Sequence, residues 1–300
     1  MEHFFKMEKL TLCPICSHSE FKPFMKLKDH SISKEDFYLV QCNGCGLLLT
    51  NPRPDERQIG PYYESQEYVS HSDTKEGIIN RLYQMVKSYT IGRKVEMVGS
   101  LSPSKNILDV GCGTGDFLGA CKSAGWKVQG VEPNNSARSL VESKFQFQPQ
   151  PEFVKENYES GSIGVITMWH VLEHVHRLDY YLSSYYELLE KNGVLIIAVP
   201  NYTSYDAAYY KDFWAAYDVP RHLFHFNRLN INDIRKKSGF TDLKVLPMKM
   251  DAFYISWLSE KYLGNSLAPL GAFISGLKSN YFAAQHPEKG YSSQLYVLSK

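Results

Sequence analysis

The sequence contains three groups of residues whose types and spacing suit chemistry. Two C-x-x-C pairs lie near the N-terminus, an aspartate with alternating glycines lies near residue 110, and two histidines flank a glutamate near residue 172. In order, these are Cys13, Cys16, Cys42 and Cys45; Asp109, Gly111, Gly113 and Gly115; and His170, Glu173 and His174. They predict a metal centre, a nucleotide pocket and a place for proton transfer.

The four cysteines have the spacing of a zinc ribbon. Each C-x-x-C turn presents two thiolates to one tetrahedral ion, and two such turns complete the site. Gly44 and Gly46 supply flexible backbone, and Phe37–Gln41 between the pairs has the composition of a strand. Disulfides and unrelated core cysteines are the alternatives, and a cytoplasmic chain disfavours disulfides. Because four thiolates leave no open position, we expect a structural zinc.

The aspartate and glycines belong to a strand, loop and helix unit. Residues 107–110 are mostly apolar and predict a buried strand, residues 116–123 have helical composition, and Gly125 is placed to end that helix. This is the first unit of a nucleotide-binding α/β sheet. The G-x-G-x-G spacing differs from that of dinucleotide binders, and no lysine follows the loop, which argues against a P-loop.

A second predicted strand, residues 127–132, ends in Glu132, where an acid can accept hydrogen bonds from ribose hydroxyls. D-x-G-x-G-x-G followed by this acid resembles the class I S-adenosylmethionine-dependent methyltransferases of types 11, 12 and 23. The resemblance runs from about Ser104 to Lys300 and implies a Rossmann-like α/β fold with a seven-stranded sheet. The residues it implies for S-adenosylmethionine binding are Asp109, Gly111, Cys112, Gly113, Gly115, Glu132, Pro133, Trp169 and His170.

The histidines follow the predicted fourth strand, residues 162–168, where open parallel sheets bind ligands. On a helix, the spacing of His170, Glu173 and His174 places all three on one face. H-x-x-E-H is also an inverse zinc-peptidase signature, but a strand of a nucleotide-binding sheet is the wrong context for a peptidase. His170 is the best candidate for a general base. The alternative is that Glu173 and His174 begin a helix and orient local backbone.

This stretch also resembles the E-x-x-E-H of ubiquinone-pathway O-methyltransferases. The resemblance implies that these residues lie at the substrate site. Whether they hold a divalent ion stays open, because His170 replaces the first glutamate and disfavours a hard-metal site.

A long segment after the predicted fifth strand, residues 202–227, has the length of a lid or binding loop. Its Arg221, His222 and His225 are candidates for binding a substrate carboxylate or phosphate and for proton transfer. Alternatively, Arg221 and His222 tie the segment to the domain. A later insertion, residues 252–290, is apolar and is expected to be helical, and it suits a greasy substrate or a membrane surface. Burial is favoured, because it has few lysines or arginines.

These features divide the chain into three parts. Residues 1–50 form the ribbon, residues 51–103 a linker and helical cap, and residues 104–300 the methyltransferase domain. The cap contains a helix over residues 78–101. Three tyrosines before it either touch the cofactor or pack against the ribbon; they are Tyr62, Tyr63 and Tyr68. Cys112 and Cys121 are expected to pack in the core.

Composition excludes some partners. The 300 residues are 43% hydrophobic, and 33 lysines and arginines against 32 acids give a net charge of +1. This balance predicts neither nucleic acid nor an anionic membrane as a partner. There is no apolar run of about 20 residues and no signal-peptide pattern, so we expect a cytoplasmic protein. The oligomeric state is not predicted.

The predicted function is O-methylation of a small molecule, namely a sugar, a lipid-linked intermediate or a secondary metabolite. Amine methyltransferases of nucleic acids carry an Asn/Asp-Pro-Pro-aromatic run where this chain has Trp169–Leu172. The four-cysteine module before the domain resembles bacterial methyltransferases of sugar-nucleotide and polysaccharide biosynthesis. Carbon methylation, with His170 or His222 forming an enolate, and a zinc-ribbon binding module with a vestigial pocket are the alternatives. Those relatives that methylate sugar carbons usually continue into a further C-terminal domain, which is not expected here.

Overall fold

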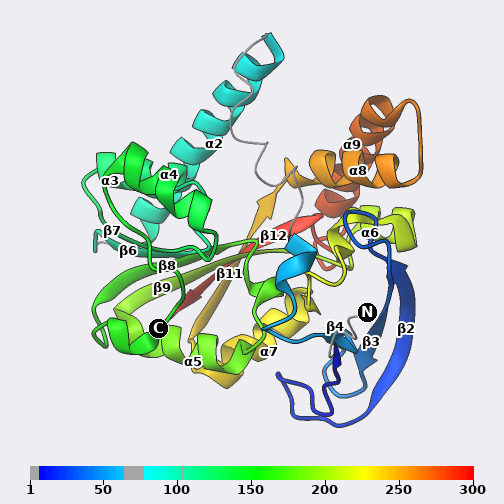
Figure 1. Ribbon diagram of the computed structural model, residues 1–300, viewed down its shortest axis with the longest axis horizontal. Helices are drawn as coiled ribbons and strands as arrows, with labels where there is room; N and C mark the ends of the chain where they lie inside the picture. Colours follow the sequence, from blue (N-terminus) through cyan, green and yellow to red (C-terminus); the bar gives the residue numbers. More distant parts are fainter. Residues whose placement is uncertain (1–6, 64–77, 103) are drawn as a thin grey trace, which may run out of the picture.

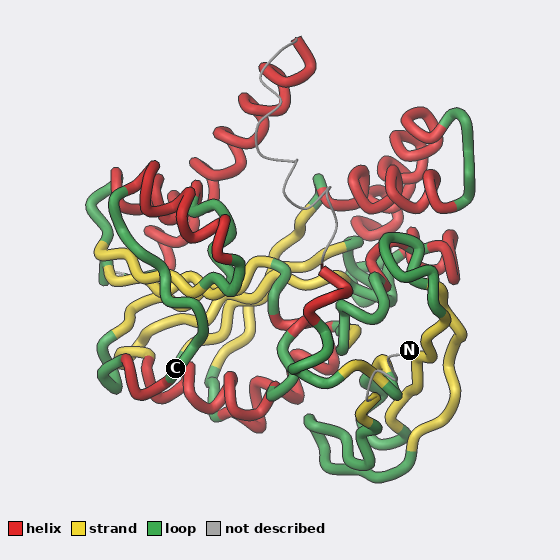
Figure 2. Tube along the Cα trace, in the orientation of Figure 1, coloured by secondary structure: helices red, strands yellow, loops and turns green. Residues whose placement is uncertain are grey.

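The computed structural model of the chain describes residues 7–63, 78–102 and 104–300. These residues form a six-stranded sheet with helices on both faces and a smaller four-stranded sheet beside it (Figures 1 and 2). A short antiparallel pair is formed by β1 (Met7–Glu8) and β5 (Arg53–Pro54). In the sequence, β1 precedes and β5 follows the first three strands of the smaller sheet. Tyr68, one of the three tyrosines named above, is outside the described residues.

The large sheet has the strand order β11-β12-β9-β8-β6-β7. Its strands are β6 (Asn106–Val110), β7 (Lys127–Val131), β8 (Ile163–Trp169), β9 (Leu189–Pro200), β11 (Asp242–Met248) and β12 (Ser293–Ser299). β9, β8, β6 and β7 are mutually parallel, whereas β12 is antiparallel to both of its neighbours. The predicted α/β sheet is confirmed, and the carboxyl ends of its parallel strands share one edge.

The seventh strand of the expected sheet is reduced to a single bridge. Gln150 forms one parallel bridge with Val131, at the free side of β7. Pro149 and Pro151 flank Gln150. Because proline has no N–H to donate to a strand ladder, the chain does not extend this pairing.

Helices cover both faces of the large sheet (Figure 1). α2 (Ile78–Leu101), α3 (Asp116–Ser123) and α4 (Asn135–Phe145) lie on one face, and α5 (Leu178–Leu188) and α7 (Arg228–Ser238) lie on the other. Neighbouring strand residues alternate between these layers, since Ile107 belongs to the core cluster that contains Val98 of α2 and Leu108 belongs to the cluster that contains Leu182 of α5. Cys112 and Cys121 are buried in the first layer, which confirms their predicted packing role.

The smaller sheet contains the predicted ribbon and one strand from elsewhere. β2 (Phe21–Lys28), β3 (Asp36–Cys42) and β4 (Leu48–Thr50) are antiparallel neighbours. The fourth strand, β10 (Phe224–His225), comes from the segment predicted as a lid and pairs with β4. The ribbon is therefore completed by residues that follow β9 in the sequence.

The segment 202–227 is packed along most of its length. It contains α6 (Tyr205–Tyr210) and two 3₁₀ turns, Lys211–Phe213 and Ala215–Tyr217. Its Trp214 and Tyr217 are buried in one cluster with Leu27 and Leu39 of the ribbon. Trp214 and Tyr217 therefore belong to a core that this segment shares with the ribbon.

The insertion between β11 and β12 is a helical hairpin, α8 (Asp251–Tyr262) and α9 (Ala268–Gln285). The prediction that its large apolar side chains are buried is wrong, because Leu270, Phe273 and Leu277 are 56%, 57% and 49% exposed. The two helices bury small residues instead, and a Cβ at Gly276 would lie 2.5 Å from the Phe253 ring. Among the described residues, no helix has the length and apolar character needed to cross a membrane.

Candidate active site

The loop between β6 and α3 uses its three glycines in two ways. All have positive φ, 73° at Gly111, 54° at Gly113 and 76° at Gly115. A Cβ at Gly111 would lie 2.5 Å from Val171 and one at Gly115 would lie 2.7 Å from Val141, so these two positions need glycine for packing. A Cβ at Gly113 would have no heavy atom within 4 Å. Gly113 is therefore where a ligand can approach the loop backbone.

Glu132, directly after β7, is held against this loop. Its Oε2 accepts a hydrogen bond from the Gly113 N–H at 2.8 Å, and its Oε1 accepts one from the Asn134 N–H at 2.9 Å. The side chain is 5% exposed, and each oxygen keeps a lone pair. A carboxylate fixed in this way suits recognition of the paired hydroxyls of a ribose.

Asp109 joins the strands that carry the loop. It is 2% exposed, and its Oδ1 accepts a hydrogen bond from the Thr167 hydroxyl at 2.6 Å, directly across the β6–β8 pairing. Burial raises the pKa of Asp109 to about 7, although the Thr167 hydroxyl and the Lys94 ammonium favour the ionised form. The protonation of Asp109 therefore changes near neutral pH.

Trp169 ends β8 beside the loop. Phe117 of α3 meets its ring edge-on with 5.5 Å between centroids, and the Nζ of Lys94 lies 3.8 Å from the ring centroid. The indole Nε1 is buried and has no hydrogen-bond partner among the residues the structure describes. Lys94 lies inside a helix and belongs to no motif, so sequence reasoning missed it.

His170 follows with left-handed backbone, φ 55°. Its Nε2 lies 3.0 Å from Oδ2 of Asp251 on α8, and its Nδ1 lies 3.4 Å from Oε1 of Glu173. Burial acts to lower the pKa of His170, but these two carboxylates outweigh burial and raise the pKa to about 10. The ring is therefore protonated at neutral pH, which argues against its predicted role as general base. No sequence signal pointed to Asp251.

Glu173 is a buried anion. It lies in a 3₁₀ turn, Leu172–His174, and not on the α-helix that the spacing predicted, because left-handed His170 interrupts the helical path. The residue is 1% exposed, and neither carboxylate oxygen makes a hydrogen bond within the described part of the chain. Burial acts to raise the pKa of Glu173, but His170 and His222 lower it to about 2.

His222 faces this carboxylate from the segment 202–227. Its Nε2 lies 4.0 Å from Oε1 of Glu173. Its Nδ1 lies 2.9 Å from the Ala216 carbonyl, which can only accept, so Nδ1 carries a proton. The fold therefore turns the Nε2 edge of an imidazole toward a buried carboxylate.

His174 meets His222 nearly at right angles. Their ring centroids are 4.6 Å apart and their planes are at 79°. The His174 Nδ1 lies 3.1 Å from the Arg221 carbonyl and 2.9 Å from the Tyr63 hydroxyl. Burial and then the charge of His222 lower the pKa of His174 to about 4. His174 is therefore neutral at pH 7, with Nε2 as its lone-pair atom.

Glu173, His174 and His222 form the centre of the candidate site. One donor atom from each lies within 4.8 Å of the other two, and two imidazoles with a carboxylate form a donor set that suits divalent zinc or iron. His225 lies outside this group, because its Nε2 is 3.3 Å from the Thr50 hydroxyl and its ring is 6.3 Å from His222. Burial lowers the pKa of His225 well below its usual value.

Arg221 ties the segment 202–227 to the ribbon. It is 6% exposed, and its guanidinium contacts Asp29 at 2.9 Å and Asp218 at 2.7 Å. It also donates to the Tyr62 carbonyl at 2.9 Å. Tyr62 is buried with its ring edge-on to Phe37 of β3, with 5.8 Å between centroids. Tyr62 thus packs against the ribbon, which was one of its two alternatives, whereas Arg221 ties the segment to the ribbon and not to the large domain as its packing alternative stated.

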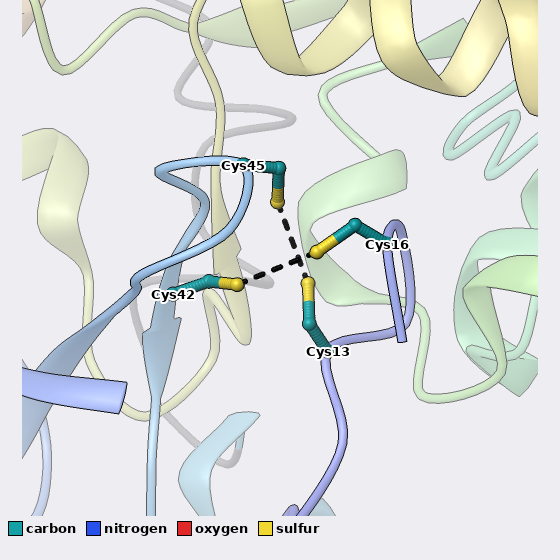
Figure 3. A group of neighbouring side chains, drawn as sticks. All are labelled: Cys13, Cys16, Cys42 and Cys45. Carbon is teal, nitrogen blue, oxygen red and sulfur yellow. Dashed lines mark hydrogen bonds between the residues drawn. The ribbon is translucent and has the colours of Figure 1, made fainter. Parts of the chain in front are cut away.

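The four cysteines converge at one end of the ribbon (Figure 3). The Sγ atoms of Cys13 and Cys45 are 3.5 Å apart, as are those of Cys16 and Cys42, and all four lie within 4.8 Å of one another. The hydrogen bond from Cys45 lowers the pKa of the Cys13 thiol to about 5. Four sulfur donors at this spacing fit one tetrahedral zinc ion.

Comparison with known proteins identifies the class. A family model described as a methyltransferase domain (Methyltransf_23) matches residues 84–245, more than half of the chain. The chain belongs to this family and is an S-adenosylmethionine-dependent methyltransferase. The predicted enzyme class is confirmed.

Individual relatives are more distant. The ubiquinone biosynthesis O-methyltransferase of Pelagibacter ubique (strain HTCC1062) is 30% identical over 113 residues, which are 34% of this chain and 45% of that protein. The chain thus matches less than half the length of this relative. A geranyl diphosphate methyltransferase in complex with SAM has a TM-score of 0.52 at 12% identity, covering 78% of this chain and 94% of that one. A SAM-dependent methyltransferase from Archaeoglobus fulgidus has a TM-score of 0.49 at 20% identity, covering 71% and 94%.

The ion pairs of His170 predict a pH-dependent stability. A pKa raised from about 6.5 to about 10 means that pairing with Asp251 and Glu173 stabilises the fold fully below pH 6.5 and is lost as the pH rises through 10. The difference in urea midpoint between wild type and His170→Asn should therefore shrink between roughly pH 6.5 and pH 10.5. Exposed His286 offers the control His286→Asn, which should show no such trend. A difference independent of pH would contradict the assignment.

Proposed function

We propose that this methyltransferase transfers a methyl group to a hydroxyl oxygen of a small acceptor held at the Glu173, His174 and His222 group. The observation that carries the proposal is a buried carboxylate beside two imidazoles, just after β8, the strand that neighbours β6 and its glycine loop. An imidazole nitrogen beside a fixed anion can accept a proton from a hydroxyl, and the anion stabilises the charge that results.

S-adenosylmethionine, when bound, supplies a methyl group to the acceptor and leaves as S-adenosylhomocysteine. The protein has to hold the acceptor oxygen in line and remove its proton. We assign proton removal to the Nε2 of His222 or of His174, and we assign to Glu173 the stabilisation of the imidazolium that forms. His170 is protonated and paired with Asp251, so it cannot act as the base, and we assign to it the positioning of Glu173.

We propose that the residues expected from the sequence to bind S-adenosylmethionine do so, and the geometry suggests a separate role for several of them. Glu132 would bind the ribose hydroxyls, Gly113 would admit the cofactor to the loop backbone, and the unpartnered Nε1 of Trp169 would face its polar atoms. Asp109 would hold the glycine loop in place through its hydrogen bond with the Thr167 hydroxyl. Gly111 and Gly115 would shape the loop through packing.

The choice of oxygen rests on the curated relative, whose name is that of an O-methyltransferase. A sugar, a lipid-linked intermediate or a secondary metabolite is the proposed acceptor class. Carbon methylation stays the alternative. The donor set supports a second arrangement, in which Glu173, His174 and His222 hold a divalent ion that would bind the acceptor oxygen. We further propose that the four-cysteine centre holds a structural zinc.

Cofactor binding is tested at Glu132. In Glu132→Gln, the new amide would turn a donor toward the N–H of Gly113 or Asn134, which should disturb the pocket. We expect S-adenosylmethionine affinity, measured by calorimetry, to fall at least tenfold, about 1.4 kcal/mol. The control Glu142→Gln, on the exposed side of α4, should bind as wild type does. Equal affinity in wild type and Glu132→Gln would exclude Glu132 as a ligand.

The zinc proposal is tested at Cys42. Cys42→Ser removes one of four thiolates, so we expect loss of the zinc retained through gel filtration and a lower Tm. Cys121→Ala, a buried cysteine in the large-sheet core, is the control and should keep the zinc. Wild-type protein that contains no zinc by elemental analysis, while folded, would overturn the proposal.

Proton removal is tested at Glu173 and His222. Hydroxyl-bearing sugars and phenols are screened by S-adenosylhomocysteine release, and we expect Glu173→Gln and His222→Gln to lower kcat about 100-fold while S-adenosylmethionine affinity is kept. His286→Gln is the control. NMR of the product separates an ether methyl from a carbon-bound methyl, and the latter outcome would replace oxygen with carbon. Unchanged kcat in both variants would refute the assigned base.

A further inference from the structure

The α8–α9 hairpin exposes an unusual amount of apolar surface. Among the described residues, sixteen large hydrophobic side chains are exposed, and nine of them lie between residues 250 and 281. These nine are Met250, Tyr254, Leu263, Leu267, Leu270, Phe273, Ile274, Leu277 and Tyr281. We call this set the hairpin surface. A concentration of this kind marks an interaction site, whereas scattered single residues do not.

On α9 the exposed residues form one continuous stripe. Leu270, Phe273, Ile274, Leu277 and Tyr281 are spaced by three and four, so they share a helix face. The opposite face holds the buried small residues that pack against α8; they are Ala268, Ala272, Ser275, Gly276, Ser279 and Ala283. A surface helix ordinarily turns its large apolar side chains inward. This helix turns them outward, so most of its apolar face is left uncovered by the described chain, although the Phe273 ring centroid lies 6.0 Å from that of Phe253.

The exposed charges on the hairpin are mostly positive. Between residues 249 and 287 the sequence holds three lysines, Lys249, Lys261 and Lys278, and two acids, Asp251 and Glu260. All three lysines are exposed, whereas Asp251 is paired with His170, and Glu260 is 5% exposed and accepts a hydrogen bond from Tyr210 at 2.9 Å. Glu288 and Lys289, just after α9, are both exposed and offset each other. The net charge of +1 over the whole chain therefore conceals a local positive rim around an apolar face.

We propose that the hairpin surface docks on an anionic lipid bilayer. The exposed leucines and Phe273 would enter the boundary between headgroups and acyl chains, and the three lysines would meet lipid phosphates. Trp257, with the Nζ of Lys261 4.1 Å from its ring centroid, supplies an aromatic side chain beside this boundary. A second copy of the chain fits less well, because a two-fold interface would bring two sets of exposed lysines together, and the two acids of the hairpin are already paired or buried.

The hairpin that carries this surface contacts the candidate active site at the start of α8. α8 begins at Asp251, whose Oδ2 lies 3.0 Å from the Nε2 of His170. In Figure 1 the hairpin stands at the margin of the molecule, away from the layer of α5 and α7. Docking would hold the site close to an amphiphilic acceptor in the bilayer. This last step rests on the proposed function, whereas the docking itself does not.

The test is sedimentation with vesicles of phosphatidylcholine alone and of phosphatidylcholine mixed with phosphatidylglycerol. We expect wild-type protein to sediment with the anionic vesicles and to be released by salt. Lys261→Gln with Lys278→Gln should weaken binding about fivefold per lysine, and Phe273→Ser with Leu277→Ser should weaken it at least tenfold. Leu229→Ser is the matched control, because Leu229 is 70% exposed on α7 and lies outside the hairpin.

Two further measurements make each outcome decisive. Calorimetry with S-adenosylmethionine on every variant verifies an intact fold, and it reports failure of the methyltransferase site separately from failure of docking. Light scattering gives the oligomeric state. If wild-type protein does not sediment with the anionic vesicles, the proposal is overturned. A wild-type dimer that Phe273→Ser with Leu277→Ser converts to monomer also overturns it, and assigns the hairpin surface to a second copy.

Discussion

The buried carboxylate of Glu173 is the constraint around which the candidate site is arranged. A carboxylate that is 1% exposed is costly unless nearby groups compensate its charge. Compensation comes from His170, which is protonated between Glu173 and Asp251, and from the edge of His222. These partners belong to the end of β8, the segment 202–227 and the α8–α9 hairpin. The Glu173 carboxylate therefore links three parts of the chain that are distant in the sequence. The same backbone is fixed by the Glu173 carbonyl, which accepts from the Leu223 N–H at 2.8 Å.

The ribbon is part of the same assembly and not an independent appendage. β10 completes its sheet, Arg221 binds Asp29 just after β2, and the buried ring of Trp214 packs in its core. The cysteine turns also contact the large domain, since the Asn230 side chain donates to the Cys45 carbonyl at 3.0 Å. Losing order at the cysteines would therefore disturb the segment that carries His222. A structural metal can support catalysis through this route without contacting a substrate.

The hairpin shows why average properties mislead. A net charge of +1 describes a protein with no preference for anionic surfaces, yet three exposed lysines lie on or just before the hairpin, and its two acids are paired with His170 or buried. Apolar composition likewise predicts burial, but the tight contact of α8 with α9 is made by Gly276 and its small neighbours, and no volume remains for Phe273 or Leu277 between the helices. Burial is decided by which residues fit the contact, and hydrophobicity alone does not decide it.

The sequence by itself determined the features that depend on neighbours along the chain. The apolar run before Asp109, the glycines after it and the acid ending the next strand specify a strand, loop and helix through local sterics and hydrogen bonding, and the C-x-x-C turns specify thiolate pairs in the same way. The single bridge at Gln150 follows from its flanking prolines. Tertiary structure decided the chemistry of the histidines. Asp251 reaches His170 across 81 positions, and His222 reaches Glu173 from a segment whose aromatic residues first had to pack against the ribbon. Such contacts carry no periodicity, so only the folded chain shows that His170 is protonated between two carboxylates and that His174 is neutral.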